Sequence, residues 1–62
     1  MSATTQAIME AVAEFEIENA KFVAGNASAG TRARKALGDL GKLSKVRRAE
    51  VTEEKNARKE AK

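Results

Sequence analysis

The sequence predicts an all-α fold, an antiparallel two-helix hairpin with coiled-coil-like packing, and three observations support this prediction. Apolar residues recur at three- and four-residue steps along two long segments, which is the period of an amphipathic α-helix. Pro is absent, so no ring geometry breaks either segment. A Gly25-Asn26 pair lies between the segments and favours a turn. Because 62 residues form at most one small domain, we expect residues 1–62 to make a single hairpin.

The first helix is expected at about residues 3–24, with Ser2 or Thr4 as its N-terminal cap. Its apolar stripe should face the second helix and consists of Ile8, Val12, Phe15, Phe22 and Val23, with Asn19 in one slot. The residues expected on its solvated side are Glu10, Glu14, Glu18 and Lys21.

The turn and the start of the second helix have two interpretations. Gly is preferred just past a helix C-terminus and Asn is a strong N-cap, so in the first interpretation the second helix begins directly at residue 26. Alternatively, residues 25–30 form a longer loop and the second helix starts at Thr31. In both cases it runs to about residue 58. Its inward arc is expected to contain Ala33, Ala36, Leu37, Leu40, Leu43 and Val51.

A turn near residue 25 also predicts the register between the helices. Leu40 should lie near Val12, and Leu43 near Ile8. In this register the start of the first helix lies opposite about residue 48 of the second. Residues 49–62 should therefore extend beyond the first helix as a charged tail, either helical or frayed. With only Phe15 and Phe22 as aromatic anchors the core is thin, and we expect a homo-oligomer. One surface for self-association is the second apolar strip of the first helix, which contains Met9, Ala13, Ile17 and Ala20.

Charge is divided unequally between the two helices. Residues 1–24 carry four Glu and one Lys, a net charge of −3, whereas residues 25–62 carry eleven Lys/Arg and five acids, a net charge of +6. Such asymmetry favours an anionic partner for the basic half. The candidate binding residues are the cations of residues 26–48: Arg32, Arg34, Lys35, Lys42, Lys45, Arg47 and Arg48. Arg32 and Arg47 lean towards the first helix and are expected to be partly architectural.

Composition argues against several functional classes. Without Cys or His, the chain lacks thiolate and imidazole metal ligands and the usual nucleophile–base pairs, so we expect no enzyme, no cofactor and no metal site. No apolar run approaches the ~20 residues needed to span a bilayer. Met1 to Ala7 is uncharged, unlike the start of a signal peptide, so a cytoplasmic protein without a membrane or small-molecule partner is expected.

The basic face favours nucleic acid, bound through its phosphate backbone. Few acids lie at helical spacing from these cations, and Arg suits phosphate oxygens. Gly38 and Gly41 lie on or beside the same face and would allow close approach. Aromatic residues for stacking and amides for reading bases are lacking there, so binding should be independent of sequence and sensitive to salt. The alternative is a protein–protein module or inhibitor that binds an acidic protein partner.

The central segment also resembles a known family. The run Gly25-Asn26-Ala27-Ser28-Ala29-Gly30-Thr31-Arg32-Ala33-Arg34-Lys35-Ala36 is followed by a Leu/Lys/Arg helix with Leu37, Leu40, Lys42, Leu43 and Lys45-Val46-Arg47-Arg48. This pattern resembles the bacterial linker-histone-like nucleoid proteins of the chlamydial histone-like type over about residues 8–55, in a short form without a long Lys/Ala-rich tail. The resemblance implies double-stranded DNA binding, DNA condensation and a nucleoid location, with the seven cations above as the matching basic positions.

Overall fold

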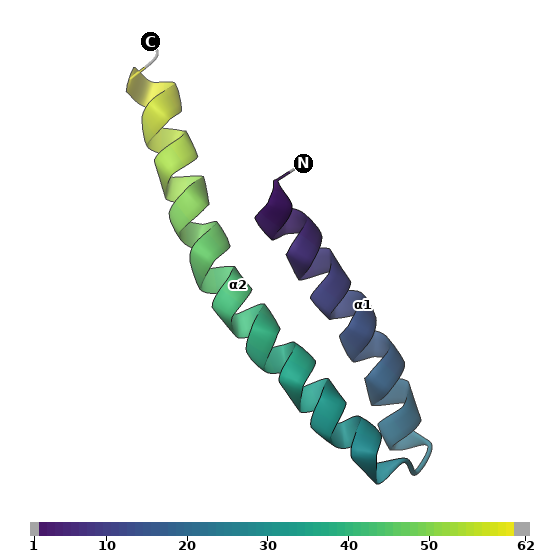
Figure 1. The fold of residues 1–62 in the computed structure, drawn as a ribbon. Helices are drawn as coiled ribbons and strands as arrows, with labels where there is room; N and C mark the ends of the chain where they lie inside the picture. Colours follow the sequence, from purple (N-terminus) through teal and green to yellow (C-terminus); the bar gives the residue numbers. More distant parts are fainter. Residues whose placement is uncertain (1, 61–62) are drawn as a thin grey trace.

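A computed structural model describes residues 2–60 as two antiparallel helices, α1 (Ala3–Val23) and α2 (Ala27–Glu60) (Figure 1). The molecule is a rod with extents of 55 × 16 × 14 Å. The all-α helical hairpin predicted from the sequence is therefore confirmed.

The start of α1 is fixed by a side-chain cap. Ser2 has an extended backbone, and its Oγ accepts a hydrogen bond from the backbone N–H of Thr5 at 3.0 Å. The two hydroxyls, Ser2 Oγ and Thr5 Oγ1, also lie 2.7 Å apart. One of the amides that a helix start leaves unpaired is thus satisfied.

The turn between the helices is a Schellman motif followed directly by an Asn cap. Gly25 has a φ of +113°, its N–H donates to Phe22 O at 3.0 Å, and Asn26 N–H donates to Lys21 O at 3.0 Å. These two bonds satisfy carbonyls at the end of α1. Asn26 Oδ1 then accepts from Ala29 N at 3.2 Å, so α2 begins at Ala27 rather than at Thr31.

The seam between the helices is lined by alanine. Among residues 2–59 the buried side chains are Ala11, Ala29, Ala33 and Ala36, each at most 8 % exposed. Larger apolar residues lie beside this line rather than on it. Ile8, Val12, Phe15, Leu40 and Leu43 are half-buried.

Four apolar residues placed in the core by their spacing are more exposed than predicted. Phe22 is 52 % exposed, Val23 77 %, Leu37 48 % and Val51 41 %. Two helices touch along a single line, so residues one step to either side of that line keep a face in water. Asn19, predicted to fill a slot of the inward stripe, is also exposed, and Glu18 takes the inward position instead.

Contacts along the seam fix the register. The ring of Phe22 covers Gly30 so closely that a methyl group built there would lie 2.7 Å from Phe22 Cδ1. At the other end, Thr4 Oγ1 donates to Glu50 Oε2 at 2.7 Å. Beyond this bond α2 continues past the start of α1, and residues 51–59 are exposed (Figure 1). Residues 61 and 62 of the predicted tail lie outside the described residues.

Candidate functional site

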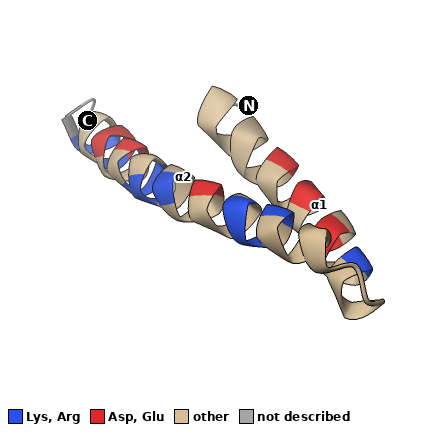
Figure 2. Cartoon of the chain, turned by 60° about the horizontal axis from the view of Figure 1, so that its bottom comes forward, with Lys and Arg blue, Asp and Glu red and all other residues tan. Residues whose placement is uncertain are grey.

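Six of the seven candidate cations lie exposed on α2, and one of these six, Arg32, is ion-paired. Among residues 2–59, none of the ion pairs within 4 Å involves the other five, so their charge is not neutralised by a direct internal partner. We call these residues the cationic side of α2; they are Arg34, Lys35, Lys42, Lys45 and Arg48. Figure 2 shows basic residues recurring along this part of α2, with an acidic residue among them, and acidic residues along α1 beyond its first turns.

Arg32 is held by the first helix. Its Nε donates to Glu18 Oε1 at 2.9 Å, and the two side chains are 45 % and 12 % exposed. This pair joins the helices across the seam, in keeping with the prediction that Arg32 leans towards the first helix. Glu18, predicted on the solvated side of α1, is instead largely covered, with its side chain 12 % exposed.

Arg47 belongs to a second internal network. Its Nη1 lies 2.8 Å from Glu50 Oε1, and its Nη2 lies 3.1 Å from Glu54 Oε2. The hydrogen bond from the Thr4 hydroxyl, followed by that from Arg47, lowers the pKa of Glu50 below its ordinary value. The bond to Glu50 correspondingly raises the pKa of Arg47. Arg47 thus links the start of α1 to α2 through Glu50.

Gly38 and Gly41 leave an open surface beside the cations. A methyl group built on either glycine would meet nothing within 4 Å. At about 100° per residue, both lie on the side of α2 that faces away from α1, between Arg34 and Lys45. The helix backbone is therefore accessible among cations, and an extended ligand can approach it closely.

Lys42 lies nearer the acidic helix than its predicted outward position. It lines a hollow between the helices together with Glu10, Glu14 and Asp39, on a floor of Ala7, Ala11 and Leu43. The carboxylates lower the local positive potential around Lys42. Among the cationic residues, Arg34 and Lys45 are farther around the helix from this acidic group.

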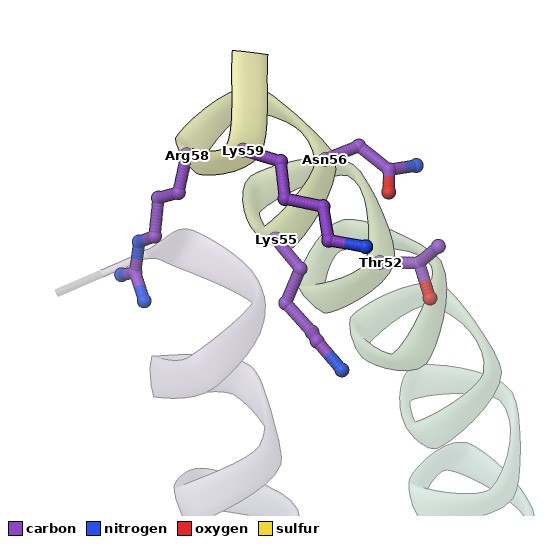
Figure 3. Close-up of a pocket in the computed structure, with 5 residues that line it drawn as sticks. All are labelled: Thr52, Lys55, Asn56, Arg58 and Lys59. Atoms are coloured by element: carbon purple, nitrogen blue, oxygen red, sulfur yellow. The ribbon is translucent and has the colours of Figure 1, made fainter. Parts of the chain in front are cut away.

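The overhang carries further cations that the sequence analysis did not single out. A shallow hollow on the last turns of α2 is lined by Thr52, Lys55, Asn56, Arg58 and Lys59. In Figure 3 the chains of Lys55 and Lys59 extend along one side of the helix, and Arg58 projects on the other side, towards α1. Lys55, Arg58 and Lys59 are spaced at three and four residues, and this spacing in the sequence indicated that they are neighbours on the helix surface. The nearby acids Glu53 and Glu54 made the segment look nearly neutral, so these cations were not selected.

Two classes of feature are absent from the described part of the chain. Residues 2–60 contain no helix that is long and apolar enough to cross a membrane. No three metal-binding side chains gather among the described residues.

Comparison with known proteins shows that the chain matches the model of one protein family. Residues 2–57 match the family model of histone H1-like protein Hc1, and the match covers α1 and all of α2 except its last three residues. No curated protein and no solved structure matches the chain.

Proposed function

Because the chain belongs to the family of histone H1-like protein Hc1, we propose that it binds double-stranded DNA without sequence preference and helps to organise the nucleoid. The observation that carries the proposal is the cationic side of α2, whose five residues are exposed and make no direct ion pair with a described carboxylate. The resulting location is the nucleoid, in the cytoplasm.

The geometry of the cationic side suits a phosphate backbone. Fourteen helical steps separate Arg34 from Arg48, which is about 21 Å at 1.5 Å per residue. Duplex DNA carries about one charge per 1.7 Å, so roughly twelve phosphates lie along this length. The open surface at Gly38 and Gly41 supports a close approach of these phosphates to α2 between the cations.

Sequence-independent binding follows from what the cationic side lacks. Residues 34–48 include no Asn, Gln or aromatic residue, which are the side chains that read adenine or stack on bases. Phe22 is half exposed, contrary to its predicted core position, but its ring packs against Gly30 near the turn. Phosphate contacts position a protein on DNA without specifying a sequence.

Arg32 and Arg47 contribute less to the proposed DNA contact than the five residues of the cationic side of α2. Each already donates to a carboxylate, and a phosphate would have to compete with Glu18 or with Glu50 and Glu54. They add positive potential and hold the hairpin in register.

Fluorescence anisotropy with labelled duplexes of unrelated sequence, at about 50 mM salt, tests the proposal. Binding at tens of micromolar protein or tighter, with similar affinity for each duplex, is expected. Absence of binding under these conditions would contradict the proposed function.

Two double variants with equal charge test the assigned residues. Arg34→Gln with Lys45→Gln removes two cations from the side facing away from α1 and should weaken binding strongly. Lys21→Gln with Arg32→Gln also removes two positive charges, but one from the acidic helix and one from an internal ion pair. A smaller loss is therefore expected, with circular dichroism reporting whether either hairpin still folds. Equal losses would mean that net charge alone governs the interaction.

An acidic protein is the alternative partner for the same cations. A stoichiometric complex recovered after nuclease treatment, from a chain that does not bind duplexes, would favour this interpretation. The family match supports DNA instead.

A further inference from the structure

The last turns of α2 extend beyond the hairpin as a single helix, residues 51–60, which we call the overhang. Residues 51–59 are all exposed, so none of them is buried against α1 (Figure 1). One α-helix with its side chains is about 10–12 Å across, whereas two helices side by side are about 20 Å wide. The major groove of B-form DNA is about 12 Å wide and admits one α-helix. Among the described residues, the overhang is therefore the part that is narrow enough to enter this groove.

The overhang carries its cations and its acids on different sides. At about 100° per residue, the residues that line the hollow share one side, which we call the polar side: Thr52, Lys55, Asn56 and Lys59. Arg58 bounds the polar side from the other direction (Figure 3). Glu53 and Glu54 lie farther around the helix, and Glu54 is held by Arg47 at 3.1 Å. The polar side therefore presents positive charge without a carboxylate among residues 51–59.

The polar side of the overhang continues the cationic side of α2. At the same angle per residue, five positions fall within an arc of about 80°: Lys45, Arg48, Thr52, Lys55 and Lys59. A duplex that contacts Lys45 and Arg48 therefore also faces the polar side. The charge and the alignment of the overhang both suit the partner proposed for the hairpin.

We propose that the overhang enters the major groove with its polar side inwards, while the cationic side of α2 contacts the phosphate backbone beside the groove. This inference rests on the proposed binding of double-stranded DNA. The two sugar–phosphate backbones border the groove, so Lys55 and Lys59 reach the phosphates of one strand and Arg58 those of the other. Glu53 and Glu54 then face out of the groove, away from the phosphates.

Thr52 and Asn56 face the base edges in this arrangement. Thr52 Oγ1 donates to Arg48 O at 3.1 Å, and its lone pairs remain available to accept a hydrogen bond. The amide of Asn56 can both donate and accept. Each base pair presents donors and acceptors in the major groove, so these two side chains find partners in different sequences. The phosphate contacts supply most of the affinity, and binding stays largely independent of sequence.

Methylation of a short duplex by dimethyl sulfate tests the position of the overhang, because guanine N7 lies in the major groove and adenine N3 in the minor groove. Anisotropy at about 50 mM salt first establishes the concentration at which the full chain saturates the duplex. At saturation, guanine N7 should be protected from methylation, whereas adenine N3 should react as in free DNA.

Two variants of equal charge test which side of the overhang faces the groove. Thr52→Glu places a carboxylate on the polar side, which offsets about one phosphate contact and should weaken binding roughly tenfold at 50 mM salt. Ala57→Glu adds the same charge on the opposite side and should cost less affinity while keeping guanine N7 protected. Both positions are exposed and lie outside the seam, so circular dichroism should show an unchanged hairpin.

Thiol labelling gives a measurement that leaves the charge of the overhang unchanged. The chain has no Cys, so one thiol can be introduced at a chosen position. With Asn56→Cys, the labelling rate should fall when duplex is added, and with Ala57→Cys it should not. Duplex binding with guanine N7 unprotected, equal losses for the two Glu variants, or an equal response of the two thiols would overturn the groove inference and leave the proposed DNA binding standing. Absence of duplex binding would overturn both.

Discussion

At the scale of single residues, two kinds of position carry the energetics of this chain. Glu50 joins Thr4 to Arg47 and so closes the open end of the hairpin. Gly38 and Gly41 lower the stability of α2 instead, because glycine weakens a helix interior. Neither makes a contact that a methyl group would disturb.

Acidification should loosen the open end of the hairpin through Glu50. Its pKa is lowered in the folded state by the bonds from Thr4 and Arg47, so its contribution to stability is fully present above the ordinary pKa of Glu. That contribution is lost as the pH falls from this value through the lowered one. Thermal unfolding followed by circular dichroism should show a smaller acid-induced loss for Glu50→Gln than for the natural chain.

Glu16→Gln is the control for this measurement. Glu16 is an exposed carboxylate of α1 outside the Thr4–Glu50–Arg47 network. Its replacement should leave the acid-induced loss unchanged, and an equal effect of both substitutions would argue against the network.

The glycines of α2 predict a stabilising substitution. Gly38→Ala and Gly41→Ala should each raise the free energy of unfolding by about 1 kcal/mol, because alanine is the better helix former and space is open. Gly30→Ala should gain less, since its methyl group would displace the ring of Phe22. Denaturant unfolding measures all three. If Gly30→Ala gained as much as the others, the packing of Phe22 on Gly30 would be unimportant.

At the scale of elements, the turn and the seam decide how the helices meet. The Schellman bonds and the Asn26 cap leave three residues, 24–26, between α1 and α2. The short connection sets the register. The register in turn brings Arg32 to Glu18 and Thr4 to Glu50.

At the turn, a Gly→Ala substitution is expected to lower the free energy of unfolding, whereas in α2 it is expected to raise it. Gly25→Ala should lower the free energy of unfolding by about 1–2 kcal/mol, because a φ of +113° is unfavourable for a residue with a Cβ atom. The denaturant series above provides the measurement, with Gly41→Ala as the matched control. A neutral Gly25→Ala would mean that the turn relaxes to another conformation at little cost.

At the scale of the whole molecule, charge separation relates the fold to the proposed function. Acids outnumber cations four to one in residues 1–24, cations outnumber acids eleven to five in residues 25–62, and two of the seven candidate cations are ion-paired across or along the seam. The other five add their charges along one rod, where a duplex can contact several at once.

The salt dependence of DNA affinity measures how many of these cations act. Five phosphates neutralised by the cationic side of α2 contribute about −4.5 to the slope of the logarithm of the association constant against that of salt concentration. Replacing Arg34, Lys35, Lys42 and Lys45 by Gln should make the slope less steep by about 3.6. Anisotropy titrations at several salt concentrations give both values. An unchanged slope in the variant would place the phosphate contacts elsewhere, for example at Lys55 and Lys59 of the overhang.

The sequence by itself determined the helical class, the turn at Gly25-Asn26 and the side of α2 on which the cations lie, because these depend on local periodicity and local capping. The tertiary structure decided which residues are buried. A contact between two helices follows one narrow line, and small side chains occupy it because they let the backbones approach. Alanines therefore took the core positions expected for Phe22 and Leu37, and Glu18 became largely covered.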